Sequence, residues 1–233
     1  MKTVRSLAAL LCYPSAELQA AAAEIREAIV SEGLLTKTAQ KKLDGLLRHL
    51  ETGDLLDLQM HYSELFDRSR SLSLHLFEHV HGDSRERGQA MIDLGEQYLR
   101  RGFLLATAEL PDFIPVFLEY ASCLKWEEAR ELLAEPSHVF AVLEQRLTQR
   151  ESPYAAVFGA VLVLTHAKPD REIMAELDAR TPSDDPAMID EEWEEKAVSF
   201  SAPIEMGGPT GVVAKLRAAA KGAVRKGTMR RSE

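Results

Sequence analysis

Apolar residues recur at helical spacing along almost all of the first 180 residues, and this pattern constrains the fold more than any other feature. A spacing of three or four residues places side chains on one face of a helix, whereas a strand alternates every second residue. No segments with the alternating strand pattern are available to pair with one another. The sequence therefore predicts an all-α protein built as a single helical bundle. Two of the stripes comprise Leu18, Ala22, Ile25 and Ile29, and then Leu43, Leu46, Leu47 and Leu50.

The starts and ends of the expected helices carry polar signals. Ser15 and Thr36 precede apolar stripes and are residue types that cap helix N-termini. Asp83, with Glu86 three residues later, resembles a capping box that would begin another helix. Gly102 follows two arginines, which is a common composition at a helix C-terminus. We therefore expect separate helices joined by short connections.

The segment Tyr154–Thr165 is apolar on every side and contains no charged residue. It is too short to span a bilayer, which needs about 20 residues, so we interpret it as the buried central helix. The N-terminal run Leu7–Cys12 superficially resembles a lipoprotein signal, but Leu11 stands where a small residue would precede the cysteine. We interpret that run as the first core helix and expect no stable membrane insertion.

The charge distribution divides the chain into three parts. Residues 1–180 form the predicted helical domain, residues 181–206 an acidic linker, and residues 207–233 a flexible basic tail. The last 20 residues hold seven basic residues and one acidic residue, so residues 1–213 carry a net charge of −15 within a total of −9. An acidic body disfavours nucleic acid and favours basic partners. The two cysteines lie far apart, which favours a reducing compartment over a disulfide framework.

Histidines and acids concentrate in the stretch Tyr62–Met91, around a predicted helix break at Gly82. His75, Glu78 and His79 match the H-x-x-E-H pattern of inverted zinc proteases, and histidines four residues apart on a helix can share a metal. A zinc hydrolase is therefore one alternative. Gly82 ends the segment one turn later and no third ligand is evident, so the sequence favours the absence of a metal site.

Three polar residues have two interpretations each. His79 and His81 either bond backbone groups at the helix end or form a pH-sensitive surface that binds a partner. Asp112 either caps the next helix or presents a carboxylate to a basic ligand. No phosphate loop, nucleophile elbow or cysteine–histidine pairing is evident, so we expect a protein that is not an enzyme and that holds no cofactor.

Two blocks of the chain have a specific order of aromatic, charged and glycine residues. They are Tyr62-x-x-Leu65-Phe66-Asp67-Arg68 and Leu76-Phe77-Glu78-His79-Val80-His81-Gly82-x-Ser84-Arg85-x-Arg87-Gly88-Gln89-Ala90-Met91. Together with Glu109–Asp112, Leu118–Tyr120, Gln149–Ala155 and Trp193–Phe200, they closely resemble the signature of the respiratory nitrate reductase assembly chaperones, the delta subunit family. Three features depart from that pattern: Phe113 stands where the wider superfamily often has histidine, His75 stands where an apolar residue is more usual, and the basic tail has no counterpart.

The resemblance, which covers about residues 4–200, implies an all-helical, cytoplasmic chaperone of the redox-enzyme maturation superfamily. Such a chaperone binds the apo catalytic (alpha) subunit of nitrate reductase, especially its N-terminal peptide, until the iron–sulfur and molybdenum cofactors are inserted. It also delays docking to the membrane subunit, and proteins of molybdenum cofactor biosynthesis are further partners that the resemblance suggests. The alternative within this class is a chaperone for another molybdoenzyme with a twin-arginine signal.

We expect the client peptide to lie in an apolar groove between helices, with an acidic rim that matches a basic amphipathic peptide. Aromatic and apolar residues would line the groove: Tyr62, Phe66, Leu76, Phe77 and Tyr120. Polar residues would supply the remaining contacts: Asp67, Glu78, His79, His81 and Asp112.

Overall fold

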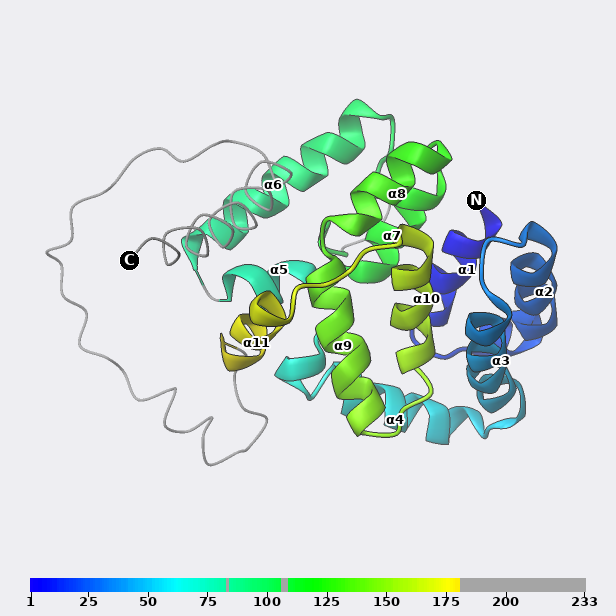
Figure 1. Cartoon of the computed structure of the whole chain (residues 1–233). Helices are drawn as coiled ribbons and strands as arrows, with labels where there is room; N and C mark the ends of the chain where they lie inside the picture. The colour runs from blue at the N-terminus through cyan, green and yellow to red at the C-terminus, as the bar shows by residue number, and fades with distance from the viewer. Residues whose placement is uncertain (83, 106–108, 181–233) are drawn as a thin grey trace, which may run out of the picture.

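The computed structural model describes residues 1–82, 84–105 and 109–180, and within these ranges the chain is mainly helical (Figure 1). The predicted all-α class is confirmed, because these ranges contain eleven α-helices, one short 3₁₀ helix and, as their sole β interaction, a bridge between His75 and Phe113. The acidic linker 181–206 and the basic tail 207–233 lie outside the described residues. None of the described helices is long and apolar enough to cross a membrane.

Polar caps begin several helices where the sequence predicted them. Ser15 Oγ accepts a hydrogen bond from the backbone N–H of Leu18, and Thr36 Oγ1 accepts one from Ala39. Gly102 has a φ of 76° just beyond Arg101, a conformation that glycine adopts without strain. The elements in chain order are α1 (Lys2–Leu10), α2 (Ala16–Glu32), α3 (Lys37–Thr52), α4 (Leu55–Phe66), η1 (Arg70–Leu72), α5 (Leu76–His81), α6 (Arg85–Arg100), α7 (Ile114–Ser122), α8 (Trp126–Ala134), α9 (Ser137–Gln149), α10 (Ala155–Thr165) and α11 (Arg171–Arg180).

Two expected caps differ in the structure. The N-cap of α6 is Ser84, and its side chain makes no cap bond, while the predicted capping residue Asp83 lies outside the described residues. The N-cap of α7 is Phe113 rather than Asp112. The interpretation of Asp112 as a helix cap is therefore wrong, because its carboxylate turns to a different segment of the chain.

The helix α10 lies at the centre of the molecule beside α9, and it also packs against α1, α3 and α8 (Figure 1). Val157, Phe158 and Val161 are buried, and the rings of Phe158 and Phe140 lie 6.1 Å apart. The prediction of a buried central helix is confirmed for this face. The opposite face of α10 is only half-buried.

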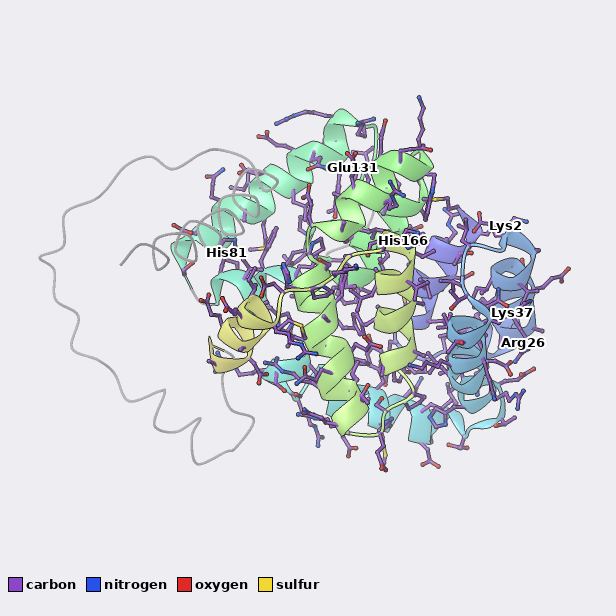
Figure 2. The ribbon with its side chains drawn as sticks, viewed as in Figure 1. Lys2, Arg26, Lys37, His81, Glu131 and His166 are labelled. Carbon is purple, nitrogen blue, oxygen red and sulfur yellow. The ribbon has the colours of Figure 1, made fainter. Side chains whose placement is uncertain are left out.

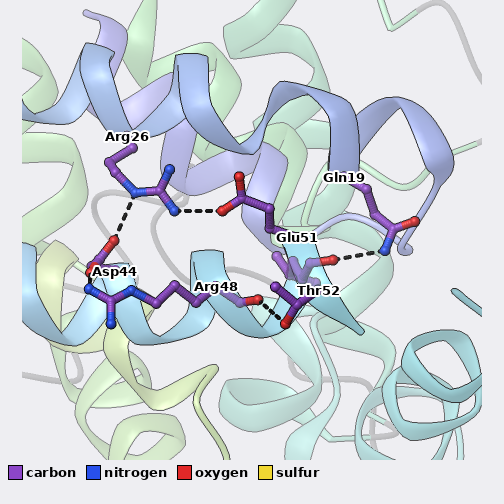
Figure 3. A network of polar contacts seen from close by, with 7 residues as sticks. Gln19, Arg26, Asp44, Arg48, Glu51 and Thr52 are labelled. Carbon is purple, nitrogen blue, oxygen red and sulfur yellow. Dashed lines mark hydrogen bonds and ion pairs between the residues drawn. The ribbon is translucent and has the colours of Figure 1, made fainter. Parts of the chain in front are cut away.

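A polar network joins α2 to α3 at the edge of the bundle (Figure 3). Arg26 of α2 donates to Asp44 at 2.7 Å and to Glu51 at 2.9 Å, so one guanidinium bridges two turns of α3. Gln19 Nε2 donates to the carbonyl of Leu50 at 2.8 Å. The start of α1 is held to the end of α2 as well, because Glu32 accepts from the backbone N–H of Lys2, which Figure 2 labels. These contacts fix the N-terminal helices as one packed unit.

Candidate functional site

Asp112 holds the loop before α7 against the start of α5. The side chain is fully buried, with 0 % exposure, and its Oδ2 accepts a hydrogen bond from the backbone N–H of Phe77 at 3.2 Å. The ring of His75 donates through Nδ1 to Oδ1 at 3.1 Å. Backbone bonds run alongside, from Leu76 N to the Asp112 carbonyl at 3.0 Å and from Ile114 N to the Leu74 carbonyl at 2.8 Å. Asp112 therefore links two blocks of the family signature inside the protein. We call its contacts with His75 and Phe77 the Asp112 joint.

The histidines of this region have different environments. The ring of His79 is buried and donates through Nε2 to the Ser73 carbonyl at 2.8 Å, so it satisfies a backbone group as one interpretation predicted. Burial lowers the pKa of His79, whereas the hydrogen bond to Asp112 raises the pKa of His75. His81 is half-buried at the end of α5 (Figure 2), with its ring 5.7 Å from that of Phe77. His81 is thus the histidine of the predicted contact set that a partner could reach directly.

The residues of the H-x-x-E-H pattern do not converge. His75 faces Asp112, His79 faces the Ser73 carbonyl, and Glu78 accepts from Arg87 of α6 at 2.9 Å. His75 precedes α5 instead of lying within it, so the two histidines are not a helical i, i+4 pair. In the part of the chain that the structure describes, no three His, Cys, Asp or Glu side chains form a group suited to a metal ion.

Tyr62 and Phe66 lie in an aromatic cluster of the core. Their ring centroids are 4.8 Å apart, and Phe66 packs edge-on against Tyr154 at 5.2 Å. The hydroxyl of Tyr62 donates to the carbonyl of Leu11 at 2.8 Å, which ties α4 to the end of α1. Asp67, the neighbouring predicted contact, is exposed at the end of α4.

The other expected groove residues are buried too. Leu76 and Phe77 point into the core beneath α5, and Tyr120 packs against Tyr98 of α6 at a centroid distance of 4.4 Å. All five aromatic and apolar residues that we expected to line an open groove therefore pack in the interior of this structure. Direct contact between these side chains and a peptide stays a prediction, and it would require the helices to move.

The exposed apolar residues of this region lie instead on α6 and in the connection between α6 and α7. Ile92 and Leu99 are 57 % and 56 % exposed, and with Gly95 they follow the i, i+3, i+7 spacing of one helix face. Pro111 lies beside that face, because its Cγ is 3.6 Å from the position of a Cβ on Gly95. Leu110, which precedes Pro111, is also exposed. We call Ile92, Leu99 and Leu110 the α6 surface.

The α6 surface was not predicted, although the sequence carries a signal for it. Met91, Leu94 and Tyr98 form the inward stripe, and Ile92 and Leu99 form a second apolar stripe on the same helix. A second stripe is more than one buried face needs, so it indicates either wider burial or an interaction surface. Of the ten predicted site residues, six meet around α5 and the Asp112 joint: Leu76, Phe77, Glu78, His79, His81 and Asp112.

Comparison with known proteins agrees with the resemblance. Residues 14–160 match the family described as nitrate reductase delta subunit. The chain is 47 % identical over 194 residues to the nitrate reductase molybdenum cofactor assembly chaperone NarJ of Escherichia coli (strain K12), which covers 83 % of this chain and 82 % of the relative.

Two further relatives carry the same kind of name. The probable chaperone NarW of the same strain is 40 % identical over 159 residues, covering 68 % of this chain and 69 % of the relative. The probable chaperone NarJ of Bacillus subtilis (strain 168) is 29 % identical over 163 residues, covering 69 % and 86 %. The signature blocks, the all-helical fold and these matches agree, and the chain belongs to the nitrate reductase delta subunit family.

Proposed function

We propose that this protein is a dedicated, non-catalytic assembly chaperone of respiratory nitrate reductase that works in the cytoplasm. It binds the apo catalytic subunit through the subunit's N-terminal peptide and keeps that subunit competent for molybdenum cofactor insertion before membrane docking. The observation that carries this proposal is the 47 % identity to a molybdenum cofactor assembly chaperone over most of both chains. Proteins of molybdenum cofactor biosynthesis are further partners within the same proposal.

The α6 surface is the part of the molecule that we propose to bind the client peptide. An amphipathic helical peptide can bury its apolar face against Ile92 and Leu99, and each fully buried side chain of this size contributes about 1.5–3 kcal/mol. The surface lies beside the Asp112 joint, because Pro111, the neighbour of Asp112, has its Cγ 3.6 Å from the position of a Cβ on Gly95. The net charge of −15 on residues 1–213 attracts a basic peptide and would mainly raise its association rate.

Deleting the gene is expected to leave the nitrate reductase subunits synthesised and membrane-associated but deficient in molybdenum cofactor. The physical reason is that the catalytic subunit closes or docks before the cofactor enters. The measurements are molybdenum content and nitrate-reducing activity of membranes from anaerobic cells grown with nitrate. Full cofactor content in a strain without any second copy of the chaperone would contradict the proposal.

Replacing Ile92 and Leu99 together by serine is expected to weaken binding of the client peptide roughly 10- to 100-fold, since apolar contacts worth a few kcal/mol are lost. Isothermal titration calorimetry with a synthetic N-terminal peptide of the catalytic subunit measures this. The matched control is Leu56→Ser with Met60→Ser, because these residues form an apolar pair on α4 that is slightly more exposed than Ile92 and Leu99. Equal affinities for the two double variants would place the peptide elsewhere, and melting temperatures would identify any general loss of stability.

A further inference from the structure

A groove runs along the outward side of α9, between α10 and α11. Its volume is about 720 Å³, and its lining includes Ala141 and Thr148 of α9, Leu162 of α10, and Met174 and Ala175 of α11. Figure 1 shows α9 with α10 on one side and α11 on the other, and α11 packs directly against α9. Ala141 and Ala175 are small, so the backbone of an added helix could approach the groove closely at these two positions.

The α11 side of the groove is held in place by Arg146, a buried residue of α9. Its guanidinium donates to the Asp178 carboxylate of α11 at 2.6 and 3.0 Å. It also donates to the carbonyl of Ser71 at 2.7 Å, which joins the same site to η1. Charge-assisted bonds from two nitrogens of one guanidinium fix orientation as well as distance. The contact between Arg146 and Asp178 therefore fixes α11 as the wall of the groove opposite α10.

The side of α10 that is turned away from the core is apolar and incompletely covered. Ala155, Ala156, Gly159, Leu162 and Val163 are each half-buried, although α10 contains no charged residue. A helix that is apolar on all sides is normally covered on all sides. This face therefore leaves apolar surface on which a further element could pack beside the groove.

A carboxylate lies at the edge of this face. Glu144 of α9 extends over Gly159, where an added Cβ would stand 2.6 Å from Glu144 Oε1. Burial raises the pKa of Glu144, and Lys42 opposes that shift from a distance. Within the described ranges no hydrogen bond or ion pair reaches this carboxylate. The groove thus combines an apolar helix face with a negative charge that a lysine or arginine would neutralise.

The chain itself contains a segment of this character. The helix α11 ends at Arg180, so residues 181–233 start from a wall of the groove. Among them the segment Val212–Lys221 is rich in alanine and carries bases but no acid. Small alanine side chains suit the small lining residues of the groove. The apolar residues at helical spacing are Val213, Leu216 and Ala220, and the basic residues are Lys215, Arg217 and Lys221.

We propose that Val212–Lys221 binds as a helix in the groove between α9, α10 and α11, with one of its basic side chains at Glu144. As a helix the segment is about 15 Å long, which the roughly 20 Å of α9 can accommodate. A linker of about 30 residues would span on the order of 30 Å if it behaved as a random coil, and a linker of that length corresponds to an effective concentration in the millimolar range. At such a concentration the segment would fill the groove of its own molecule even if its affinity for the groove were weak.

A photoreactive benzophenone amino acid at Leu216, in the purified 233-residue protein without client, tests this contact. Irradiation is expected to form intrachain crosslinks that mass spectrometry maps to the peptides 141–149, 155–163 and 171–178. The same amino acid placed at Ser201 should not give this pattern. Glu144→Gln keeps the shape of the side chain and removes its charge, so it should lower the yield roughly two- to fivefold.

Glu131→Gln is the matched control, because Glu131 is exposed on α8, away from the groove (Figure 2), and this change should leave the crosslink yield unaltered. A mixture of isotopically light and heavy protein separates contacts within one chain from contacts between two copies. Crosslinks spread over the whole surface, or found between chains, would overturn the proposal. An unchanged yield in a Glu144→Gln protein with wild-type melting temperature would overturn the role of Glu144 and with it the assigned groove.

Discussion

Replacing Phe77 by alanine is expected to lower the free energy of unfolding by about 3–5 kcal/mol, as removal of a buried aromatic ring usually does. Phe77 is 2 % exposed, its ring packs beside that of His81, and its backbone N–H is bound to Asp112. The alanine variant therefore leaves a cavity at the contact between α5 and the loop before α7. Urea denaturation followed by circular dichroism measures the change, since a shift of midpoint at constant slope reports stability alone.

The matched control for Phe77 is Leu104→Ala, because Leu104 is 75 % exposed and its truncation should change the free energy of unfolding by less than about 0.5 kcal/mol. A loss below 1 kcal/mol for Phe77→Ala would mean that the ring is not packed in solution as it is here. Client affinity is then measured under conditions in which both variants are folded. If Phe77→Ala weakens binding there while Ile92→Ser with Leu99→Ser does not, the peptide enters beneath α5 and the α6 surface is not its site.

The helical architecture was predictable because its determinants are local. Caps such as Ser15 and Thr36 act on amides three residues away, and Gly102 ends α6 through its own backbone conformation. The apolar period of a helix likewise fixes its inward face without knowledge of its neighbours. The sequence therefore predicted the fold class and the central helix α10 from short-range patterns alone.

The site was harder to predict because burial depends on which helix covers which. Tyr62, Phe66 and Tyr120 carry the residue types of a binding groove and of an aromatic core equally well, and the positions of Tyr154 and Tyr98 decide between the two. Those partners lie far along the chain or on another helix, so periodicity does not reveal them.

The Asp112 joint was hard to predict for the same reason, because its partners are distant in the sequence. Asp112 contacts His75 and Phe77, which lie 37 and 35 residues earlier, and a contact over that separation cannot be predicted from a local sequence pattern. Its position just before a proline-containing helix start instead favoured a cap. The family signature identified these residues as a group, but their spacing could not tell an internal joint from a contact surface.

Removing the Asp112 carboxylate is expected to have the other large effect. Asp112→Ala leaves the Phe77 amide and the His75 ring without their acceptor, and loss of a buried charged partner typically costs about 3–5 kcal/mol. Asp112→Asn keeps the shape and one acceptor oxygen, so its cost should be smaller, on the order of 1–3 kcal/mol. Denaturant unfolding of both variants at one pH measures the two losses of stability. Equal stabilities of the wild type and Asp112→Ala would contradict a stabilising role of the Asp112 joint.

The pH dependence of the Asp112→Asn deficit tests whether the charge of His75 contributes. The bond to Asp112 raises the pKa of His75 above its ordinary value of 6.5, so the folded state binds this proton more tightly than the unfolded state. That stabilisation is complete below the unfolded pKa and is lost as pH rises through the folded pKa. The asparagine variant lacks it, and its deficit should therefore be larger near about pH 6 than near about pH 8.5. In a His75→Ala background the deficit should not vary over this range, whereas a pH-independent deficit with His75 present would show that the contact is made by a neutral ring.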